Sequence, residues 1–422
     1  MESNFEKEVQ ERAVLVGLNA DCFTKEQTAT DETLEELEAL LETAGGFCTA
    51  KVMQNRHTPD SHSFIGEGKA QEVRMLAEAT ESTMVIFDNE LSPGNIRALE
   101  EIIGLPVLDR SALILDIFAQ RARTKEGRLQ VELAQYQYLL PRLSGMGSSL
   151  SRQGGGIGTR GPGETKLESD RRHIRERIHR LEEELEQVRQ VRSVQRERRM
   201  KNSVPVVAIV GYTNAGKSTL LNKLTGAGIP ANNRLFDTLD TTSRQLKVSD
   251  NLDVILSDTV GFIAKLPHHL VNAFRATLEE LEYADLLLHV IDASDPNREE
   301  HIAVVDKLIA QLARKETPML RCYNKADLVA KEDIPTGQDI VATSAAMGQG
   351  MDQLLAAIEN ALGHARHHVT LCLPYSMGGQ VETLHNNAQV KSVDYTADGI
   401  EIEAVLDDIL YGRLKDYITK EC

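Results

Sequence analysis

The sequence predicts an α/β protein in which a doubly wound sheet follows a smaller parallel α/β domain and a long helical hairpin, with a short α+β domain at the end. Three observations predict it. Short apolar runs alternate with amphipathic helical segments in two separate regions. Long helical patterns around one glycine-rich stretch separate these regions. The 422 residues suffice for several domains. We expect domains at residues 1–110, 111–202, 203–364 and 365–422.

The first domain begins with an apolar run, Arg12–Leu18, which is typical of a buried strand. The segment Asp31–Gly46 has acidic residues at its start and glycine at its end, as helices often do. A second strand pattern follows at Phe47–Gln54, and the alternation continues to residue 110. This order predicts a small parallel sheet surrounded by helices.

The second region consists of helical patterns. One helix is expected at Ser111–Ala122, another at about 129–143 and a third at about 165–199. The apolar residues of the third follow the alternating four- and three-residue spacing of a coiled-coil seam: Ile174, Ile178, Leu181, Leu185 and Val188. The last two helices predict a hairpin about 50 Å long, and its tip is the glycine-rich segment 144–163.

Charge is distributed unevenly along the chain. The net charge is −17, yet residues 121–201 carry 19 Lys and Arg against 11 Asp and Glu. Residues 1–120 carry 9 against 23. A basic segment between acidic parts fits contact with a phosphate backbone, and it equally fits a solvated helix with many salt bridges.

Several classes of protein are disfavoured by composition. The cysteines are scattered without a C-x-x-C pair, which fits a reducing cytoplasm rather than a disulfide framework. No apolar run approaches the roughly 20 residues that span a bilayer, and the acidic start does not resemble a signal peptide. The histidines form no convincing set of metal ligands.

The hairpin tip contains a G-x-G-x-x-G pattern at Gly156, Gly158 and Gly161. A dinucleotide-binding fingerprint follows a buried strand and opens a helix. Here no strand pattern precedes the glycines, and Pro162 follows them. We therefore interpret the segment either as an RNA-contacting tip or as a linker.

A phosphate-binding loop is the strongest motif in the chain. The apolar run Val204–Val210 leads into G-x-x-x-x-G-K-[ST] at Gly211–Ser218, and a helix pattern follows. This is the strand–loop–helix context of a P-loop. Lys217 is expected to contact the β- and γ-phosphates, and Ser218 to bind Mg²⁺. The expected nucleotide contacts are Gly211, Tyr212, Thr213, Asn214, Ala215, Gly216, Lys217, Ser218 and Thr219.

Three further motifs follow in the order of a GTP-binding domain. A strand pattern ends in D-x-x-G at Asp258–Gly261, and another ends in N-K-x-D at Asn324–Asp327. The third motif is "VATSAAMG", in which the backbone of Ser344 and Ala345 can bond guanine O6. Asp258 is expected to hold Mg²⁺ through water. The Asp327 carboxylate can accept hydrogen bonds from both N–H groups of guanine, which adenine lacks. The expected contacts are Asp258, Thr259, Val260, Gly261, Asn324, Lys325, Ala326, Asp327, Ser344, Ala345 and Ala346.

At these motifs the chain resembles P-loop GTPases related to Era, TrmE and Obg. The segments "HSFIGEGKAQEV", "VELAQYQYLLPRL", "GGGIGTRGPGETKLE" and "DTVGFI" resemble the HflX family in particular. On this resemblance "RLFDTLDTTSR" is switch I, and Thr238 is its Mg²⁺-binding threonine, with Thr241 or Thr242 as alternatives. The implied contacts are Phe236, Asp237, Thr238, Leu239 and Asp240.

Two residues are expected to affect hydrolysis, Lys217 and Phe262. Phe262 stands at the position where other GTPases carry a glutamine that orients the attacking water. Phenylalanine cannot hydrogen-bond water, so intrinsic hydrolysis is expected to be slow, or another group must position the water. Related GTPases with an asparagine at the place of Asn214 recruit K⁺, which makes K⁺ a second candidate cofactor beside Mg²⁺.

The HflX resemblance implies a cytoplasmic, monomeric GTPase that binds the ribosome, chiefly the large subunit and its rRNA, and dissociates ribosomes under stress. The hairpin would then contact RNA by shape and phosphate, through Arg152, Arg160, Lys166, Arg171 and Arg172. Two alternatives stay open: a regulatory GTPase switch acting on a protein partner, and an NTP-dependent RNA-remodelling factor.

Overall fold

The architecture comes from a computed structural model. It describes the chain apart from residues 1–9, 26, 144–161, 202–203, 227–234, 237–241, 250–251, 266–280, 314–316, 364–365, 398 and 422. The chain forms two compact units. The first comprises residues 1–186 together with 232–240 and 263–275, and the second comprises residues 187–231, 241–262 and 276–422. Each is described by itself.

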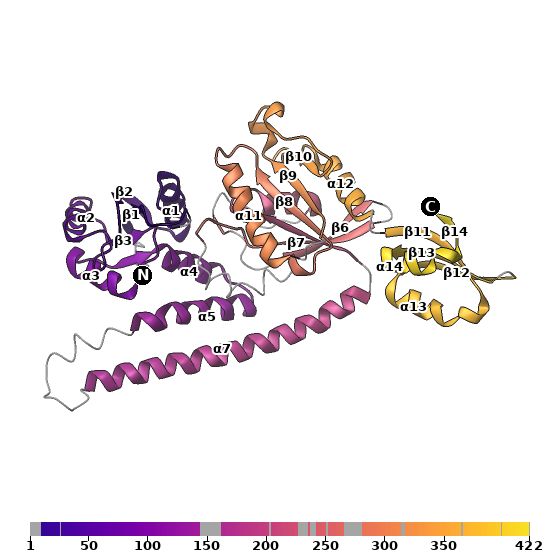
Figure 1. Ribbon diagram of the computed structural model, residues 1–422, viewed down its shortest axis with the longest axis horizontal. Helices are drawn as coiled ribbons and strands as arrows, with labels where there is room; N and C mark the ends of the chain where they lie inside the picture. Colours follow the sequence, from indigo (N-terminus) through magenta and orange to yellow (C-terminus); the bar gives the residue numbers. More distant parts are fainter. Residues whose placement is uncertain are drawn as a thin grey trace, which may run out of the picture. The chain divides into compact units, whose positions relative to one another are not determined.

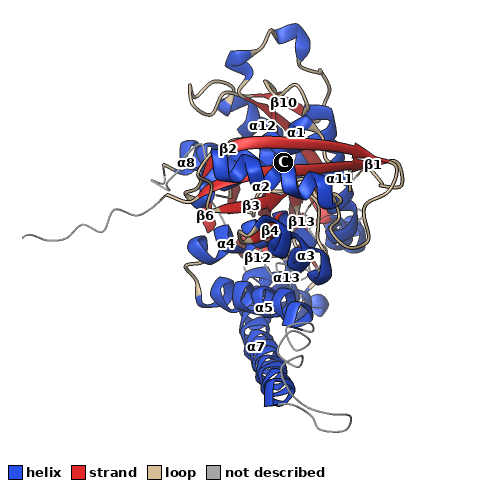
Figure 2. Ribbon diagram, turned by 90° about the vertical axis from the view of Figure 1, so that its left-hand side faces the viewer, coloured by secondary structure: helices blue, strands red, loops and turns tan. Residues whose placement is uncertain are grey.

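The N-terminal sheet has the strand order β2-β1-β3-β4 and is parallel throughout (Figure 1). Its strands are β1 (Arg12–Ala20), β2 (Phe47–Arg56), β3 (Met84–Phe87) and β4 (Val107–Asp109). Helices α1 (Asp31–Ala44), α2 (Glu67–Ala79), α3 (Pro93–Ile103) and α4 (Arg110–Arg121) alternate with them. Figure 2 shows β1 and β2, the longest strands of this sheet, side by side. The expected parallel α/β domain is confirmed.

Helices begin where the sequence supplies N-caps. Thr30 and Thr33 form a reciprocal capping box at α1, and α1 ends at Gly45 in the left-handed conformation. Asp109 caps α4 without a reciprocal partner, since its carboxylate accepts from Ala112 N. These local signals explain why the element boundaries of this domain were predictable.

The hairpin helices are α5 (Lys125–Arg142) and α7 (Pro162–Lys201), which lie side by side in Figure 1. Arg177 of α7 donates two hydrogen bonds, of 2.8 and 2.9 Å, to the Glu132 carboxylate of α5. Leu181 and Leu185 of the expected seam are buried. Helix α7 starts at Pro162, inside the segment expected to be the tip, because proline fits the first turn of a helix.

The second unit contains a six-stranded sheet of order β10-β9-β8-β5-β7-β6, in which only β6 is antiparallel to its neighbour. The strands are β5 (Val206–Gly211), β6 (Thr242–Ser249), β7 (Leu252–Asp258), β8 (Leu286–Asp292), β9 (Met319–Asn324) and β10 (Ile340–Ala342). Its described helices are α8 (Lys217–Thr225), α11 (Arg298–Leu312) and α12 (Met351–Gly363). The chain thus forms the doubly wound sheet expected for a P-loop GTPase.

The C-terminal domain has an antiparallel sheet of order β12-β13-β11-β14. Its elements are β11 (Arg366–Leu373), α13 (Gly379–Asn387), β12 (Gln389–Thr396), β13 (Gly399–Asp407), α14 (Asp408–Leu414) and β14 (Ile418–Glu421). The pattern of residues 407–418, "DDILYGRLKDYI", predicts a closing helix, but the helix ends at Leu414. Residues 418–421 instead pair with β11, a partner distant in sequence.

Among the residues that the structure describes, no helix combines the length and apolar character needed to cross a bilayer.

Candidate functional site

The phosphate-binding loop connects β5 to α8, as the motif predicted. Gly211 has φ +155°, and a Cβ there would lie 2.2 Å from the Val290 carbonyl oxygen of β8. Gly216 has φ +92°, and a Cβ there would lie 2.2 Å from Asn324 Nδ2. Both positions therefore require glycine, because any side chain would collide with the neighbouring strands.

Lys217 lies inside the curl of this loop and is buried. Its Nζ donates to the carbonyl oxygens of Gly211 and Tyr212, at 3.1 and 2.8 Å. Burial lowers the pKa of Lys217 to about 8, and the nearby Asp258 carboxylate opposes that shift. A phosphate placed here would favour the charged ammonium, because an adjacent anion stabilises it.

A candidate magnesium site lies where β7 ends beside the first turn of α8. The Ser218 hydroxyl donates to Asp258 Oδ2 at 2.9 Å. A hydroxyl and a carboxylate are hard oxygen ligands of the kind Mg²⁺ takes together with phosphate oxygens and water. The residues present therefore fit this cation. The third expected ligand, Thr238, lies outside the described residues, as do Asp237, Leu239 and Asp240.

The D-x-x-G segment is hydrogen-bonded to the phosphate-binding loop. Phe262 N donates to Gly211 O at 3.1 Å, and Phe262 O accepts from Thr213 N at 2.7 Å. Gly261 is so close that a Cβ would lie 3.0 Å from Lys217 Nζ. The Phe262 side chain is buried, and its apolar ring offers no hydrogen bond to water.

The N-K-x-D residues lie at the end of β9 and in the turn after it. Asn324 joins two loops: its Nδ2 donates to Ala215 O at 2.9 Å, and its Oδ1 accepts from Ala345 N at 3.0 Å. Lys325 pairs with Asp292 at 2.6 Å. Asp327 lies in a short 3-10 helix with its side chain exposed. The base-binding and phosphate-binding motifs are thus brought together through one amide.

The remaining predicted nucleotide contacts are distributed as follows. Thr259 and Ser344 are buried, and the Thr259 hydroxyl donates to Ile209 O at 2.7 Å. Phe236 packs against Phe118 within the first unit, with ring centroids 4.7 Å apart. Thr219 lies in helix α8. Val260 lies within the D-x-x-G segment, Ala326 lies within N-K-x-D, and Ala346 directly follows Ala345.

The candidate RNA contacts are only partly described. Arg171 and Arg172 lie on α7, Arg171 half-buried and Arg172 exposed. Lys166 belongs to α7, but its side chain lies outside what the structure describes, and Arg152 and Arg160 lie outside the described residues altogether. Among the described residues, no cluster of three or more His, Cys, Asp and Glu side chains could hold a metal ion.

One contact of the phosphate-binding loop has no signal in the sequence. The Tyr212 ring stacks on His301 of α11, with centroids 3.7 Å apart and planes 9° apart. His301 Nδ1 lies 3.1 Å from Asp295 Oδ2, and this hydrogen bond lowers the pKa of Asp295. His301 and Asp295 support the phosphate-binding loop from the side of α11. His301 reaches Tyr212 only because α11 packs beside that loop.

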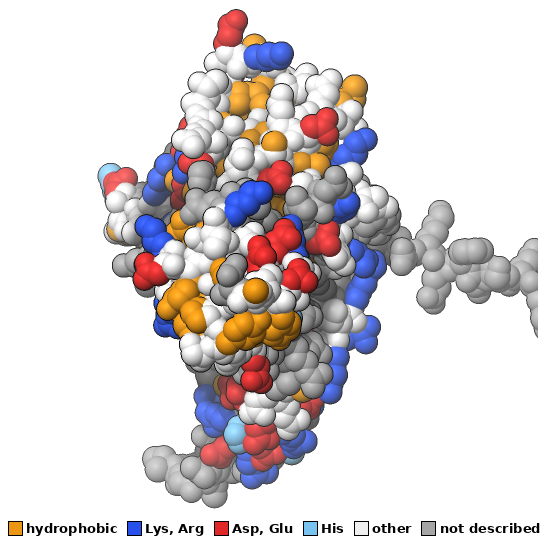
Figure 3. Space-filling model, turned by 90° about the vertical axis from the view of Figure 1, so that its right-hand side faces the viewer, with side chains coloured by type: hydrophobic (Ala, Val, Ile, Leu, Met, Phe, Trp, Pro, Cys, Tyr) orange, Lys and Arg blue, Asp and Glu red, His pale blue; other side chains and the backbone are white. Residues whose placement is uncertain are grey.

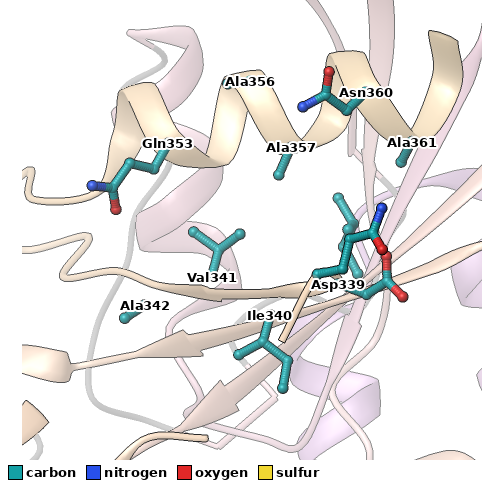
Figure 4. Close-up of a pocket in the computed structure, with 11 residues that line it drawn as sticks. Asp339, Ile340, Val341, Ala342, Gln353, Ala356, Ala357, Asn360 and Ala361 are labelled. Atoms are coloured by element: carbon teal, nitrogen blue, oxygen red, sulfur yellow. The ribbon is translucent and has the colours of Figure 1, made fainter. Parts of the chain in front are cut away.

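A pocket of about 560 Å³ lies between β10 and α12 at the sheet edge (Figure 4). It is lined by Ile340, Val341, Ala342, Gln353, Asn360 and three alanines of α12, among others. None of its lining residues belongs to the four nucleotide motifs. The nucleotide site is therefore defined by the motif loops rather than by this pocket.

Comparison with known proteins places this geometry in a family. Three family models match the chain: "GTP-binding GTPase N-terminal" at residues 31–119, "GTP-binding GTPase Middle Region" at 121–199 and "50S ribosome-binding GTPase" at 206–325. The GTPase HflX of Caldanaerobacter subterraneus is 48% identical over 97% of this chain and 94% of its own length. The chain belongs to the HflX family. It is a GTPase that binds guanine nucleotides.

Other HflX proteins agree with this assignment. GTPase HflX of Escherichia coli K12 is 45% identical over 87% of each chain. Among solved structures, a GTP-binding protein of Sulfolobus solfataricus in complex with GDP is 25% identical, covering 84% of this chain and 99% of that chain, with a TM-score of 0.43. The resemblance inferred from the sequence is confirmed by the two HflX relatives, which are 48% and 45% identical over 97% and 87% of this chain.

Proposed function

We propose that this HflX-family GTPase binds the ribosome in the cytoplasm as a monomer and dissociates its subunits under stress. The tip of the α5–α7 hairpin would contact rRNA of the large subunit. The observation that carries the proposal is the excess of Lys and Arg in residues 121–201, 19 against 11 acidic residues, on a two-helix arm.

The charge distribution supports the hairpin as the RNA-contacting element. On the face shown in Figure 3, acidic and basic side chains are interspersed over the centre of the view. Cationic side chains attract the phosphate backbone irrespective of sequence. The family model described as "50S ribosome-binding GTPase" matches residues 206–325 and supports the large subunit as the partner.

The nucleotide site would act in the following way. Ser218, and Asp258 through water, would hold Mg²⁺, which supplies neutralisation of the phosphate charge when it is bound. Lys217 holds the terminal phosphates, and the backbone N–H groups of the loop and the first turn of α8 face the same anion. Asp327 selects guanine. Because Phe262 offers no hydrogen bond to water, we propose that K⁺ at Asn214 or a ribosomal group assists hydrolysis.

Sedimentation with ribosomes tests the proposal. The full-length protein is compared with a variant in which Arg152, Arg160, Arg171 and Arg172 are changed to Glu, each with a non-hydrolysable GTP analogue or with GDP. We expect the unmodified protein to co-sediment with large subunits and to split 70S particles in the GTP-analogue state. The variant should lose both properties and still bind GDP.

A matched control carries reversed charge elsewhere. Arg74 lies exposed on α2 and pairs with Glu78, so Arg74→Glu should leave ribosome binding unchanged. If the hairpin variant still sediments with ribosomes, the arm is not the RNA contact. If the unmodified protein ignores ribosomes but responds to another protein, the chain is a regulatory switch for that partner.

A further inference from the structure

The loop that connects β8 to α11 contacts the base-binding motif at its start. Asp292, the last residue of β8, accepts from Lys325 Nζ of the N-K-x-D motif at 2.6 Å. The same carboxylate accepts from the backbone N and the hydroxyl of Ser294, at 3.0 and 2.6 Å. Asp292 therefore fixes the beginning of this loop beside the N-K-x-D motif.

Further along, the loop is tied to the first turns of α11. The Asp295 carboxylate accepts from Asn297 N at 2.8 Å, and its Oδ2 lies 3.1 Å from His301 Nδ1. Arg298 Nη1 donates to Ala293 O at 3.1 Å. The hydrogen bond from His301 lowers the pKa of Asp295, so this carboxylate stays charged over a wide range of pH. The imidazole of His301 is thus oriented by Asp295.

The oriented imidazole covers a residue of the phosphate-binding loop. Helix α11 packs against β5 and β8, and its His301 ring stacks on the Tyr212 ring with centroids 3.7 Å and planes 9° apart. Tyr212 is 8% exposed, and the His301 side chain is 26% exposed. Aromatic pairs contribute more than the area that they bury, so this stack restrains the Tyr212 side chain.

Tyr212 connects this outer contact to the lysine inside the loop. Its carbonyl oxygen accepts from Lys217 Nζ at 2.8 Å and from Ala215 N at 3.3 Å. Burial lowers the pKa of Lys217 to about 8, whereas hydrogen bonds to the ammonium favour its charged form. A shift of the Tyr212 carbonyl would therefore weaken a contact that keeps Lys217 charged and in place.

The backbone on either side of Tyr212 is restrained separately. Phe262 N donates to Gly211 O, and Phe262 O accepts from Thr213 N. The stack on His301 adds a restraint on the residue between them. Both kinds of contact lie within the second unit, as do the N-K-x-D motif and α11.

We propose that His301 is a positioning residue for nucleotide binding: its imidazole, oriented by Asp295, holds the Tyr212 ring and thereby the carbonyl that anchors Lys217. The loop from β8 to α11 then connects the base-binding motif to the phosphate-binding loop through one series of contacts. This role rests on the binding of guanine nucleotides and is independent of contact with the ribosome.

Nucleotide affinities of full-length variants test this role, measured by competition against a fluorescent GDP analogue. His301→Ala removes the ring and should weaken GDP binding by about fivefold, within the range that an aromatic pair contributes. His301→Phe keeps a flat ring and should retain most of the unmodified affinity. Because Lys217 contacts the β-phosphate in P-loop proteins, His301→Ala should change the affinity for GMP much less than that for GDP.

A double-mutant cycle determines whether His301 acts through Tyr212. Tyr212→Leu removes the partner ring, so adding His301→Ala to that variant should leave the GDP affinity unchanged. Residues that act through one contact give such non-additive effects, whereas independent residues give additive ones. Additive losses of affinity would overturn the proposal.

His367→Ala is the matched control. His367 stacks on Tyr411 with centroids likewise 3.7 Å apart, in the C-terminal domain, which carries none of the nucleotide motifs. This change should lower the melting temperature and leave GDP affinity unchanged. If His301→Ala does the same, or if it weakens GMP as much as GDP, its stack serves stability alone and the proposal is wrong.

The remaining outcomes are also decisive. If His301→Phe binds GDP as weakly as His301→Ala, the ring does not hold Tyr212 and the proposal is wrong. Should His301→Ala not fold, His301→Leu fills the space without a flat ring and carries the same expectation. If ribosome sedimentation fails while His301→Ala weakens GDP binding selectively, the proposed function is wrong and the role of His301 holds.

Discussion

At the scale of single residues, the proposed selection of guanine depends on Asp327. Its neighbours Asn324 and Lys325 are fixed by hydrogen bonds to Ala215 and Asp292, whereas the Asp327 side chain is exposed and directed by the short 3-10 helix in which it lies. Asn324 and Lys325 therefore fix the position of the backbone that carries the Asp327 carboxylate.

Asp327→Asn should exchange guanine for xanthine specificity. The carboxylate accepts two N–H groups of guanine, and hydrogen bonds to charged groups contribute roughly 1.5–3 kcal/mol each. We expect GDP affinity to fall by about a hundredfold or more, and xanthosine diphosphate to become the better ligand, because xanthine has an oxygen where guanine has an amino group. Competition against a fluorescent nucleotide measures both affinities.

The control for that change is Asp333→Asn, a nearby exposed carboxylate in the next 3-10 helix. It should leave nucleotide preference unchanged. An Asp327→Asn protein that still prefers GDP would show that the base is selected by other groups.

At the scale of elements, the phosphate-binding loop combines a buried strand, three residues with positive φ and a helix start. Gly211, Asn214 and Gly216 are those residues. Asparagine tolerates the left-handed region better than most residues, so Asn214 fits its φ of +60°. Its exposed side chain is the proposed K⁺ ligand.

Turnover in KCl against NaCl tests the potassium proposal. We expect the unmodified chain to hydrolyse GTP about tenfold or more faster in KCl, since a fixed cation beside the transferring phosphate stabilises the transition state. Asn214→Gly keeps the backbone conformation and removes the amide oxygen, so its turnover should be the same in both salts. Equal turnover of the unmodified chain in the two salts would contradict the proposal.

At the scale of the whole molecule, the negative net charge does not by itself argue against contact with nucleic acid. The sum is −17, but the proposed contact segment is basic. Acidic surfaces elsewhere repel nucleic acid, which restricts contact to the hairpin. Ribosome binding should therefore depend strongly on salt although the protein is acidic overall.

A salt titration measures this dependence at constant Mg²⁺. Five cationic contacts should give roughly a hundredfold to a thousandfold loss of ribosome affinity between 50 and 200 mM salt. The variant with four arginines changed to Glu should show a much flatter dependence. A flat dependence in the unmodified chain would mean that neutral contacts dominate, and the RNA contact would have to be placed elsewhere.

The sequence by itself determined the features that depend on neighbouring residues. The loop Gly211–Ser218 is contiguous, and its glycines and lysine specify a phosphate-binding conformation without reference to the rest of the chain. The alternation of apolar runs and capped helices likewise predicted the parallel N-terminal sheet and the doubly wound sheet of the second unit. These signals are local, so propensity and periodicity suffice to find them.

The tertiary structure decided what depends on segments far apart in sequence. Residues 418–421 form a strand because β11 offers an open edge, although the predicted closing helix reached to about Ile418. His301 supports Tyr212 because α11 packs beside the phosphate-binding loop. Lys265 is neutralised by Asp88 because the end of β3 leaves a buried carboxylate beside Arg110. Such contacts arise from packing and burial of charge, which no local pattern encodes.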